Sequence, residues 1–210
     1  MSPIKIIIFD CDGVILDSVD IKTRAFASLF EEYGKEAVKL ITDYHLLHGG
    51  VSRFEKFKYF FREHLGRQIT EHEMQTLDKR FTKAALTALL KTPFIPGAKE
   101  FITTHHEKWP LYVASGAPEH ELRFIFEHLG LTEYFHGIHG SPTPKDAILA
   151  RIVQENKIKP EHALMIGDSY TDLAAAKAVG TRFLGVGEFE PPHPWMHDLT
   201  GLEKFLETLT

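Results

Sequence analysis

Short apolar runs alternate with amphipathic stretches at the start of the chain and again from residue 96 onward. Five runs have the length and composition of buried strands, and they cover residues 4–9, 111–115, 137–141, 163–167 and 182–186. The stretches between the later runs carry apolar residues at helical spacing, and several end beside a glycine, a common helix stop. This alternation predicts an α/β fold with a Rossmann-like parallel sheet and helices on both of its faces.

The segment from residue 18 to about residue 92 follows a different pattern. No run in it has strand character, whereas Ile21, Ala25 and Leu29, and later Leu77 and Phe81, recur at helical spacing. The proline-containing stretch TPFIPG (92–97) then leads back to the alternating pattern. We therefore predict a helical cap domain at residues 17–92, inserted into a catalytic core made of residues 1–16 and 93–210.

Composition narrows the range of partners. A formal net charge of −5 argues against general nucleic-acid binding, which requires a basic face. The apolar run at 4–9 is too short for a signal peptide, and no run has transmembrane length. The single cysteine, Cys11, excludes an internal disulfide and is expected to be a small buried residue. These features predict a cytoplasmic protein without a membrane partner, and they leave the oligomeric state unknown.

The polar residues of greatest interest all follow predicted strands. They are Asp10, Asp12, Ser115, Lys145, Asp168 and Asp172. Ligands of parallel α/β sheets bind at the carboxyl ends of the strands, so we expect these side chains to share one site. A single aspartate in such a place is often only a helix cap, but six polar residues at successive strand ends indicate function.

The charges in this set suggest a ligand. Four carboxylates with one lysine require a neutralising partner or a raised pKa, and hard oxygen ligands favour Mg²⁺. Lys145 and the hydroxyl of Ser115 are suited to phosphate oxygens. One carboxylate can then attack phosphorus, while a second, kept partly protonated by its negative neighbours, donates a proton to the leaving alcohol.

Four runs together resemble the ordered motifs of the haloacid dehalogenase superfamily. They are FDCDGVILDS (9–18), VASGA (113–117), TPKDAIL (143–149) and IGDSYTDLAAAKAVG (166–180). The resemblance implies that Asp10 is the nucleophile and a metal ligand. It implies that Asp12 is the general acid and base and binds metal through its backbone carbonyl.

The same resemblance assigns the remaining residues. Ser115, with Gly116 beside it, and Lys145 would hold the transferring phosphoryl group. Asp168 would complete the Mg²⁺ site, and Asp172 would orient Lys145 or a metal-bound water. The true dehalogenases of the superfamily lack an aspartate at the position of Asp12 and need no metal, so its presence here favours phosphoryl transfer.

Two positions depart from the family pattern. The family often has asparagine or a small polar residue after the motif serine, where this chain has Gly116. Proline commonly follows the motif lysine, but here Pro144 precedes Lys145. Both departures keep the hydroxyl and the charge, so we expect them to change local shape rather than chemistry.

The cap carries the candidate for substrate recognition. GVSR (50–53) resembles the cap loop of β-phosphoglucomutases, whose arginine binds the distal phosphate of a sugar phosphate. Arg53 is therefore predicted to bind a distal phosphate or a carboxylate. Lys56 and Lys58 are interpreted as an exposed helix face. Lys22 stands where those mutases have a hinge histidine, and it too is expected to be exposed.

These observations predict a Mg²⁺-dependent phosphomonoester hydrolase that acts on a small phosphorylated metabolite through an aspartyl-phosphate intermediate. A phosphosugar mutase is the first alternative, although the missing hinge histidine and the pair Pro118–Glu119 after the motif serine argue for hydrolysis. A receiver domain phosphorylated on aspartate also gathers acids at strand ends, but it lacks a long helical insertion. A non-catalytic phosphate-binding or scaffold protein on the same core is the last alternative.

Overall fold

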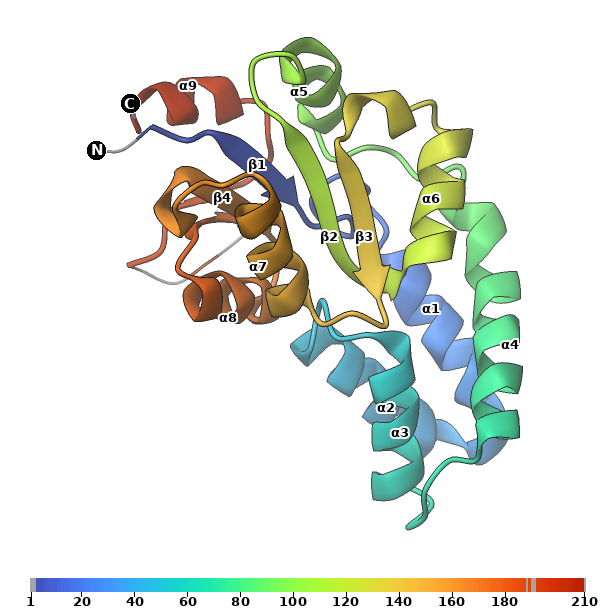
Figure 1. Cartoon of the computed structure of the whole chain (residues 1–210). Helices are drawn as coiled ribbons and strands as arrows, with labels where there is room; N and C mark the ends of the chain where they lie inside the picture. Colours follow the sequence, from blue (N-terminus) through green and yellow to red (C-terminus); the bar gives the residue numbers. More distant parts are fainter. Residues whose placement is uncertain (1–2, 188, 190–191, 210) are drawn as a thin grey trace.

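Six parallel strands form one sheet in this computed structural model, which describes residues 3–187, 189 and 192–209. The order across the sheet is β3-β2-β1-β4-β5-β6 (Figure 1). The strands are β1 (Ile6–Phe9), β2 (Leu111–Pro118), β3 (Gly137–Ser141), β4 (Ala163–Gly167), β5 (Arg182–Val186) and β6 (Trp195–Met196). The predicted Rossmann-like parallel sheet is confirmed, and the two-residue strand β6 is an addition that the sequence pattern did not indicate.

Nine α-helices and three short 3₁₀ helices occur in the described chain. The α-helices are α1 (Val19–Phe30), α2 (Lys35–Leu47), α3 (Arg53–Glu63), α4 (Glu71–Leu89), α5 (Ala98–His105), α6 (Glu119–His128), α7 (Lys145–Glu155), α8 (Tyr170–Val179) and α9 (Leu202–Glu207). The 3₁₀ helices are η1 (Glu31–Tyr33), η2 (Thr132–Tyr134) and η3 (Pro160–His162).

Helices cover both faces of the sheet because its central strands bury side chains in both directions. On β1, Ile6 and Ile8 pack in a cluster with residues of α7 and α8. Ile7 and Phe9 point the other way, into a larger cluster with residues of α5, α6 and α9. A strand buried on both faces needs a continuous apolar run, which is what the sequence IIIF provides.

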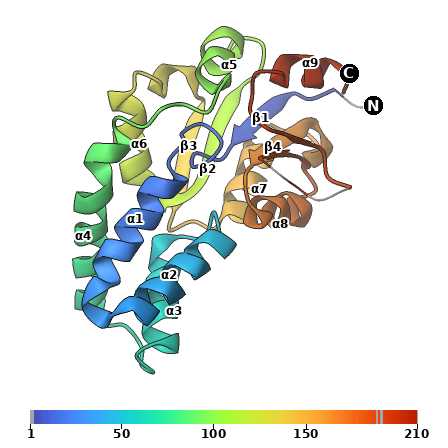
Figure 2. The same ribbon diagram turned by 180° about the vertical axis from the view of Figure 1, so that it is seen from behind.

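Helices α1 to α4 lie together beyond the carboxyl ends of the strands, as both views of the ribbon show (Figures 1 and 2). The two segments that join them to the sheet run side by side. Asp17 N donates to Pro93 O at 3.0 Å, and Ile95 N donates to Ile15 O at 3.0 Å. The inserted region is helical, as predicted, while the domain boundaries at residues 17 and 92 stay a prediction.

The inserted helices share an aromatic core. Phe26, Phe30, Phe57, Phe60 and Phe81 are each no more than 2% exposed. Phe30 and Phe60 have ring centroids 4.0 Å apart, and Phe26 and Phe81 have centroids 4.7 Å apart. Because these rings come from α1, α3 and α4, their packing helps to fix how these helices are placed relative to one another.

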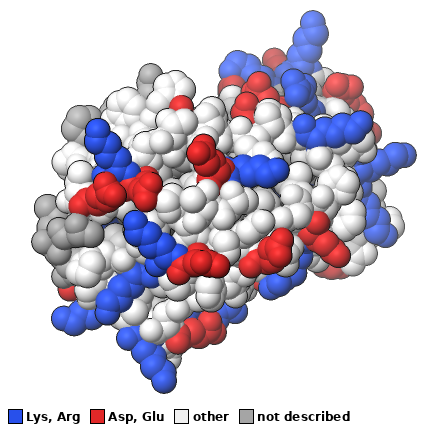
Figure 3. Space-filling view, turned by 90° about the horizontal axis from the view of Figure 1, so that it is seen from above, with Lys and Arg blue, Asp and Glu red and all other residues white. Residues whose placement is uncertain are grey.

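The surface carries mixed charge. On the face shown in Figure 3, Lys and Arg side chains are interspersed with Asp and Glu side chains. Within residues 3–187, 189 and 192–209, no helix is long and apolar enough to span a membrane.

Removal of an aromatic ring from the inserted helices tests this packing. We expect Phe57→Ala to lower the free energy of unfolding by about 3–5 kcal/mol, because the fully buried ring leaves a cavity between α1, α3 and α4. Phe124→Ala, at a ring that is 49% exposed, is the matched control and should change it by less than about 1 kcal/mol. Urea denaturation measures both, and equal losses would contradict the account.

Candidate active site

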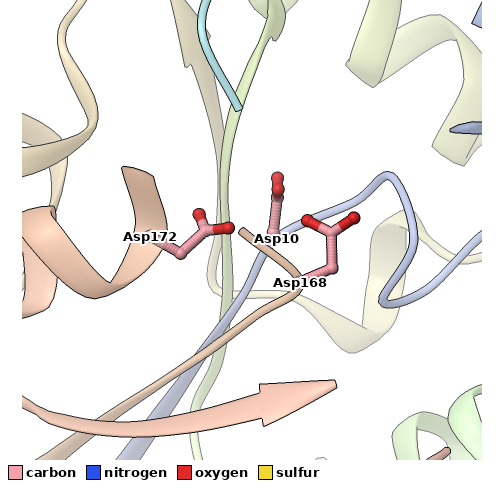
Figure 4. A group of neighbouring side chains, drawn as sticks. All are labelled: Asp10, Asp168 and Asp172. Carbon is pink, nitrogen blue, oxygen red and sulfur yellow. The ribbon is translucent and has the colours of Figure 1, made fainter. Parts of the chain in front are cut away.

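Three carboxylates meet at the ends of β1 and β4, which are neighbours in the sheet. Asp10 follows β1, Asp168 follows β4, and Asp172 lies in the first turn of α8. Their carboxylate groups lie close together (Figure 4), and one oxygen from each falls within 4.8 Å of the others. Parallel pairing of Phe9 with Ile166 places these strand ends at the same level, so the backbone brings the acids together.

Lys145 is the cation at the centre of this cluster. It begins α7, and its Nζ lies 3.1 Å from Asp10 Oδ2 and also donates to Asp172 Oδ1. Asp172 is fully buried, and its Oδ2 accepts from Ser169 N at 3.1 Å. Asp172 therefore contacts Lys145, the placement expected for a residue that orients it.

Ser115 and Gly116 lie at the end of β2. Ser115 is 2% exposed, and its Oγ accepts from Ala117 N at 3.2 Å. Together with Lys145, Ser115 and Gly116 line a cavity of about 580 Å³. The structure thus gathers the three residues that the family pattern assigns to phosphate.

The loop before α3 is seated on Gly116. A Cβ atom at Gly116 would lie 2.1 Å from Gly50 O, so only glycine permits this approach. Thr171 Oγ1 also donates to Gly49 O. The inserted helices are therefore closed on the core. A second cavity, of about 320 Å³, lies between these helices and the core.

Asp12 does not belong to the close group of three carboxylates, and it lines this second cavity together with Asp168. Its Oδ1 accepts from Ser18 Oγ at 2.5 Å, and its Oδ2 forms an ion pair with Lys22 Nζ. The expectation that Lys22 is exposed is wrong, because its side chain is only 12% exposed. Helix α1 directs it back at the strand end, which a single charge in a helical pattern does not reveal.

The pKa values of the cluster reflect its excess of carboxylates over cations. Burial raises the pKa of Asp10 from 3.8 to about 7; Lys145 opposes this rise, and Asp172 and Asp12 add to it. Burial and the charge of Asp10 raise the pKa of Asp168 well above its ordinary value. Lys145 shows the opposite balance: burial lowers its pKa, but Asp10 and Asp172 outweigh burial and raise it.

Asp12 behaves differently from its neighbours. Burial raises its pKa, but the ion pair with Lys22 and the hydrogen bond from Ser18 outweigh burial and lower it. The expectation that negative neighbours keep Asp12 partly protonated is therefore wrong in this conformation. The nearest charge to its carboxylate is a cation from α1 rather than another acid.

Arg53, the predicted substrate-binding residue of the cap, has protein partners. Its Nε lies 2.7 Å from Asp78 Oδ1, and its second terminal nitrogen lies 2.8 Å from Glu121 Oε2 and 3.1 Å from Thr82 Oγ1. It is 5% exposed and still lines the 320 Å³ cavity. Its predicted contact with substrate stays a prediction.

The expectation for Lys56 is wrong, whereas Lys58 is exposed as predicted. Lys56 is 2% exposed, and its Nζ lies 2.7 Å from His45 Nδ1. A signal for its burial was present, since Arg53, Lys56, Phe57 and Phe60 follow the i, i+3, i+4, i+7 spacing of one helix face. Lys22, His45 and Glu121 are further residues of the cavity that the sequence interpretation did not include.

The carboxylate cluster fits a divalent cation. Three carboxylates within 4.8 Å present hard oxygen donors, and the raised pKa values of Asp10 and Asp168 show negative charge that Lys145 alone does not balance. Mg²⁺ prefers such donors and keeps part of its shell for water and phosphate. Asp10 and Asp168 are suited to hold the ion.

Comparison with known proteins supports the same class of enzyme. A model of the haloacid dehalogenase-like hydrolase family matches residues 4–180, so the chain belongs to this family. A phosphoglycolate phosphatase of Aliivibrio fischeri is 26% identical over 186 residues, which cover 84% of this chain and 81% of the relative. A 5'-nucleotidase of Pseudomonas aeruginosa is 26% identical over 218 residues, which cover 96% and 95%.

Solved structures confirm the fold. A β-phosphoglucomutase from Clostridium difficile superimposes with a TM-score of 0.77 at 18% identity, and the match covers 98% of this chain and 99% of that one. The prediction of a phosphatase-type enzyme of the haloacid dehalogenase superfamily is confirmed by the family match and by the phosphatases among the relatives.

The raised pKa of Asp10 has a consequence for stability in the metal-free protein. The folded state holds this proton more tightly than the unfolded state, so the stabilisation is complete below about pH 4 and is lost as pH rises to about 7. In the wild type, this proton should make the free energy of unfolding fall by a few kcal/mol at most between about pH 4 and pH 7, and Asp10→Asn should remove that fall. Urea denaturation in chelator at several pH values measures the difference, and parallel curves for the two proteins would contradict it.

Proposed function

We propose that the chain is a Mg²⁺-dependent phosphomonoester hydrolase that acts on a small phosphorylated metabolite through an aspartyl-phosphate intermediate. The observation that supports this most is the Lys145 ammonium, buried between Asp10 and Asp172 and lining one cavity with Ser115 and Gly116. A phosphoryl group beside Asp10 would meet a fixed cation, a hydroxyl and a glycine backbone.

In the first step Asp10 attacks phosphorus, and the bond from phosphorus to the leaving oxygen breaks as Asp12 gives that oxygen a proton. In the second step Asp12 takes a proton from water, the water oxygen attacks phosphorus, and phosphate leaves as the Asp10 carboxylate is restored. Lys145 and Ser115 bind the phosphoryl oxygens in both steps. Mg²⁺, held by Asp10, Asp168 and the Asp12 backbone carbonyl, would offset the charge on phosphate and keep Asp10 ionised.

The closed arrangement supports the proposed role of Asp12 as the base. Paired with Lys22, its carboxylate is ionised and ready to accept a proton. The acid role requires that Asp12 take up a proton before the first step. Separation of Lys22 from Asp12 as the inserted helices open would raise the pKa of Asp12 and allow this.

The cavity between the inserted helices and the core supports the proposed class of substrate. Its volume of about 320 Å³ suits a leaving group of a few heavy atoms rather than a polymer. The relatives include enzymes named for phosphoglycolate and for nucleotides, which are both phosphomonoesters of small molecules. We expect a cytoplasmic enzyme that binds neither nucleic acid nor a membrane.

A phosphosugar mutase is the second candidate. It is favoured by the GVSR loop at residues 50–53 and by the fold shared with a β-phosphoglucomutase. A mutase must protect its aspartyl-phosphate from water, whereas a hydrolase needs only to admit water. Lys22 contacts Asp12 here in the place where those mutases carry a hinge histidine. A receiver domain loses its support, because the chain belongs to a family of hydrolases.

The hydrolase is tested with a generic aryl phosphate. With Mg²⁺, the wild-type protein should release phosphate, and Asp10→Asn should lower kcat by more than about 1000-fold because the nucleophile is lost. Asp20→Asn, at an exposed acid of α1, is the matched control and should keep wild-type turnover. Turnover by Asp10→Asn at the wild-type rate would exclude Asp10 as nucleophile.

The mutase is tested by product analysis with a sugar monophosphate primed by its bisphosphate. The hydrolase proposal predicts free sugar and inorganic phosphate from the monophosphate, and a monophosphate and inorganic phosphate from the bisphosphate, because water reaches the intermediate. Phosphorus NMR of the mixture separates the two outcomes. Accumulation of the isomeric sugar phosphate without inorganic phosphate would establish the mutase instead.

A further inference from the structure

The cavity between the inserted helices and the core contains more charge than the reaction needs. Asp12 and Asp168, which are acids of the proposed site, line it. The walls add the cations Lys22, Arg53 and Lys56, together with His45 and Glu121. The cation that has no carboxylate partner is the one available to an anionic ligand.

Two of the three cations are already matched by carboxylates. Arg53 contacts both Asp78 and Glu121, so two negative charges surround one guanidinium. Lys22 is paired with Asp12. Neither has to find a further anion to balance its charge.

Lys56 has no carboxylate partner within the part of the chain that the structure describes. Its one hydrogen-bonding contact there is His45 Nδ1, at 2.7 Å, and its Nζ lies 5.5 Å from the ring centroid of Phe26. Both groups are at least nine-tenths buried, Lys56 at 2% exposed and His45 at 7%. A buried ammonium without a counter-ion is unfavourable, and an anion in the cavity would relieve this cost.

The titration of the pair agrees with this geometry. Burial and the nearby charge of Lys22 lower the pKa of Lys56 to about 7, against the opposing effect of Asp12, Asp168 and Asp10. Burial and Lys56 lower the pKa of His45 to about 3, so the ring is neutral and its Nδ1 accepts from the ammonium. Among the described residues, His45 Nε2 has no hydrogen-bond partner. The backbone of Val19 opposes the lowering of the His45 pKa in part.

We propose that Lys56 is a specificity residue that binds an anionic group, a carboxylate or a second phosphate, at the far end of the leaving group. This inference rests on the proposed phosphomonoesterase function and narrows its substrates to doubly anionic esters. Lys56 then carries the recognition that the sequence pattern assigned to Arg53. Arg53 joins α3 to α4 and α6 through Asp78 and Glu121 instead.

Three esters with the same two-carbon unit test the proposal. The far end is a carboxylate in carboxymethyl phosphate, a second phosphate in 1,2-ethanediol bisphosphate and an uncharged hydroxyl in 2-hydroxyethyl phosphate. The wild type should prefer an anionic ester by at least about tenfold in kcat/KM, and Lys56→Met should reduce that preference at least about tenfold, mainly through KM. The ester with the larger loss identifies the anion.

Lys58→Met is the matched control, because Lys58 lies on the same helix with its side chain 55% exposed and paired with Glu55. It should keep the wild-type preference. A preference that survives in Lys56→Met, or that Lys58→Met reduces equally, would overturn the role of Lys56. A wild type that hydrolyses all three esters equally would overturn the inference while the proposed function stands.

The pH dependence of the wild type gives a readout that does not require the variant to fold. Only protonated Lys56 binds an anion, so the preference should be greatest below about pH 7 and should fall as pH rises through it. A preference that is constant from pH 6 to pH 9 would overturn the proposal. Failure to hydrolyse these esters and p-nitrophenyl phosphate alike would overturn the proposed function, and the inference with it.

Discussion

The structure depends on one buried ion cluster, in which Lys145 lies between Asp10 and Asp172 at the carboxyl ends of the parallel strands. Neither carboxylate is more than 1% exposed, so without Lys145 two charges would be buried against each other. The lysine does not balance the whole site, because Asp168 joins the same group with a raised pKa. This residual negative charge links the fold to its chemistry, since a divalent cation would offset it and could also bind an oxygen of a phosphoryl group.

The inserted helices complete the site rather than merely cover it. Their loop rests on Gly116 and leaves a cavity in which acids of the core face cations of α1 and α3. Lys22 is paired with Asp12, and Lys56, which contacts His45, is the residue proposed to bind the far end of the substrate. The proposed mechanism therefore gives these helices a part in both proton transfer and the choice of leaving group, although the carboxylate proposed to react, that of Asp10, follows a strand of the sheet.

Much of the core followed from the sequence for simple physical reasons. A strand buried on both faces needs an uninterrupted apolar run, so IIIF and ALMIG could be located directly. Parallel strands end at one edge, so Asp10, Ser115, Lys145 and Asp168 could be grouped before their contacts were known. The pairing of Lys22 with Asp12 could not be predicted from the sequence, because it depends on the direction in which α1 leaves the strand. The burial of Lys56 could have been predicted from helical spacing alone, but a lysine on a helix with both polar and apolar residues is usually expected to be exposed.

The central claim is that Asp10 becomes covalently phosphorylated during turnover. Rapid acid quenching of the Mg²⁺-loaded enzyme with an ester labelled at phosphorus tests it most directly. The account predicts label on the peptide that contains Asp10 at early times, and none there when Asp10 is replaced by Asn. Label on a different residue, or steady turnover by a protein that carries no label at any quench time, would contradict it.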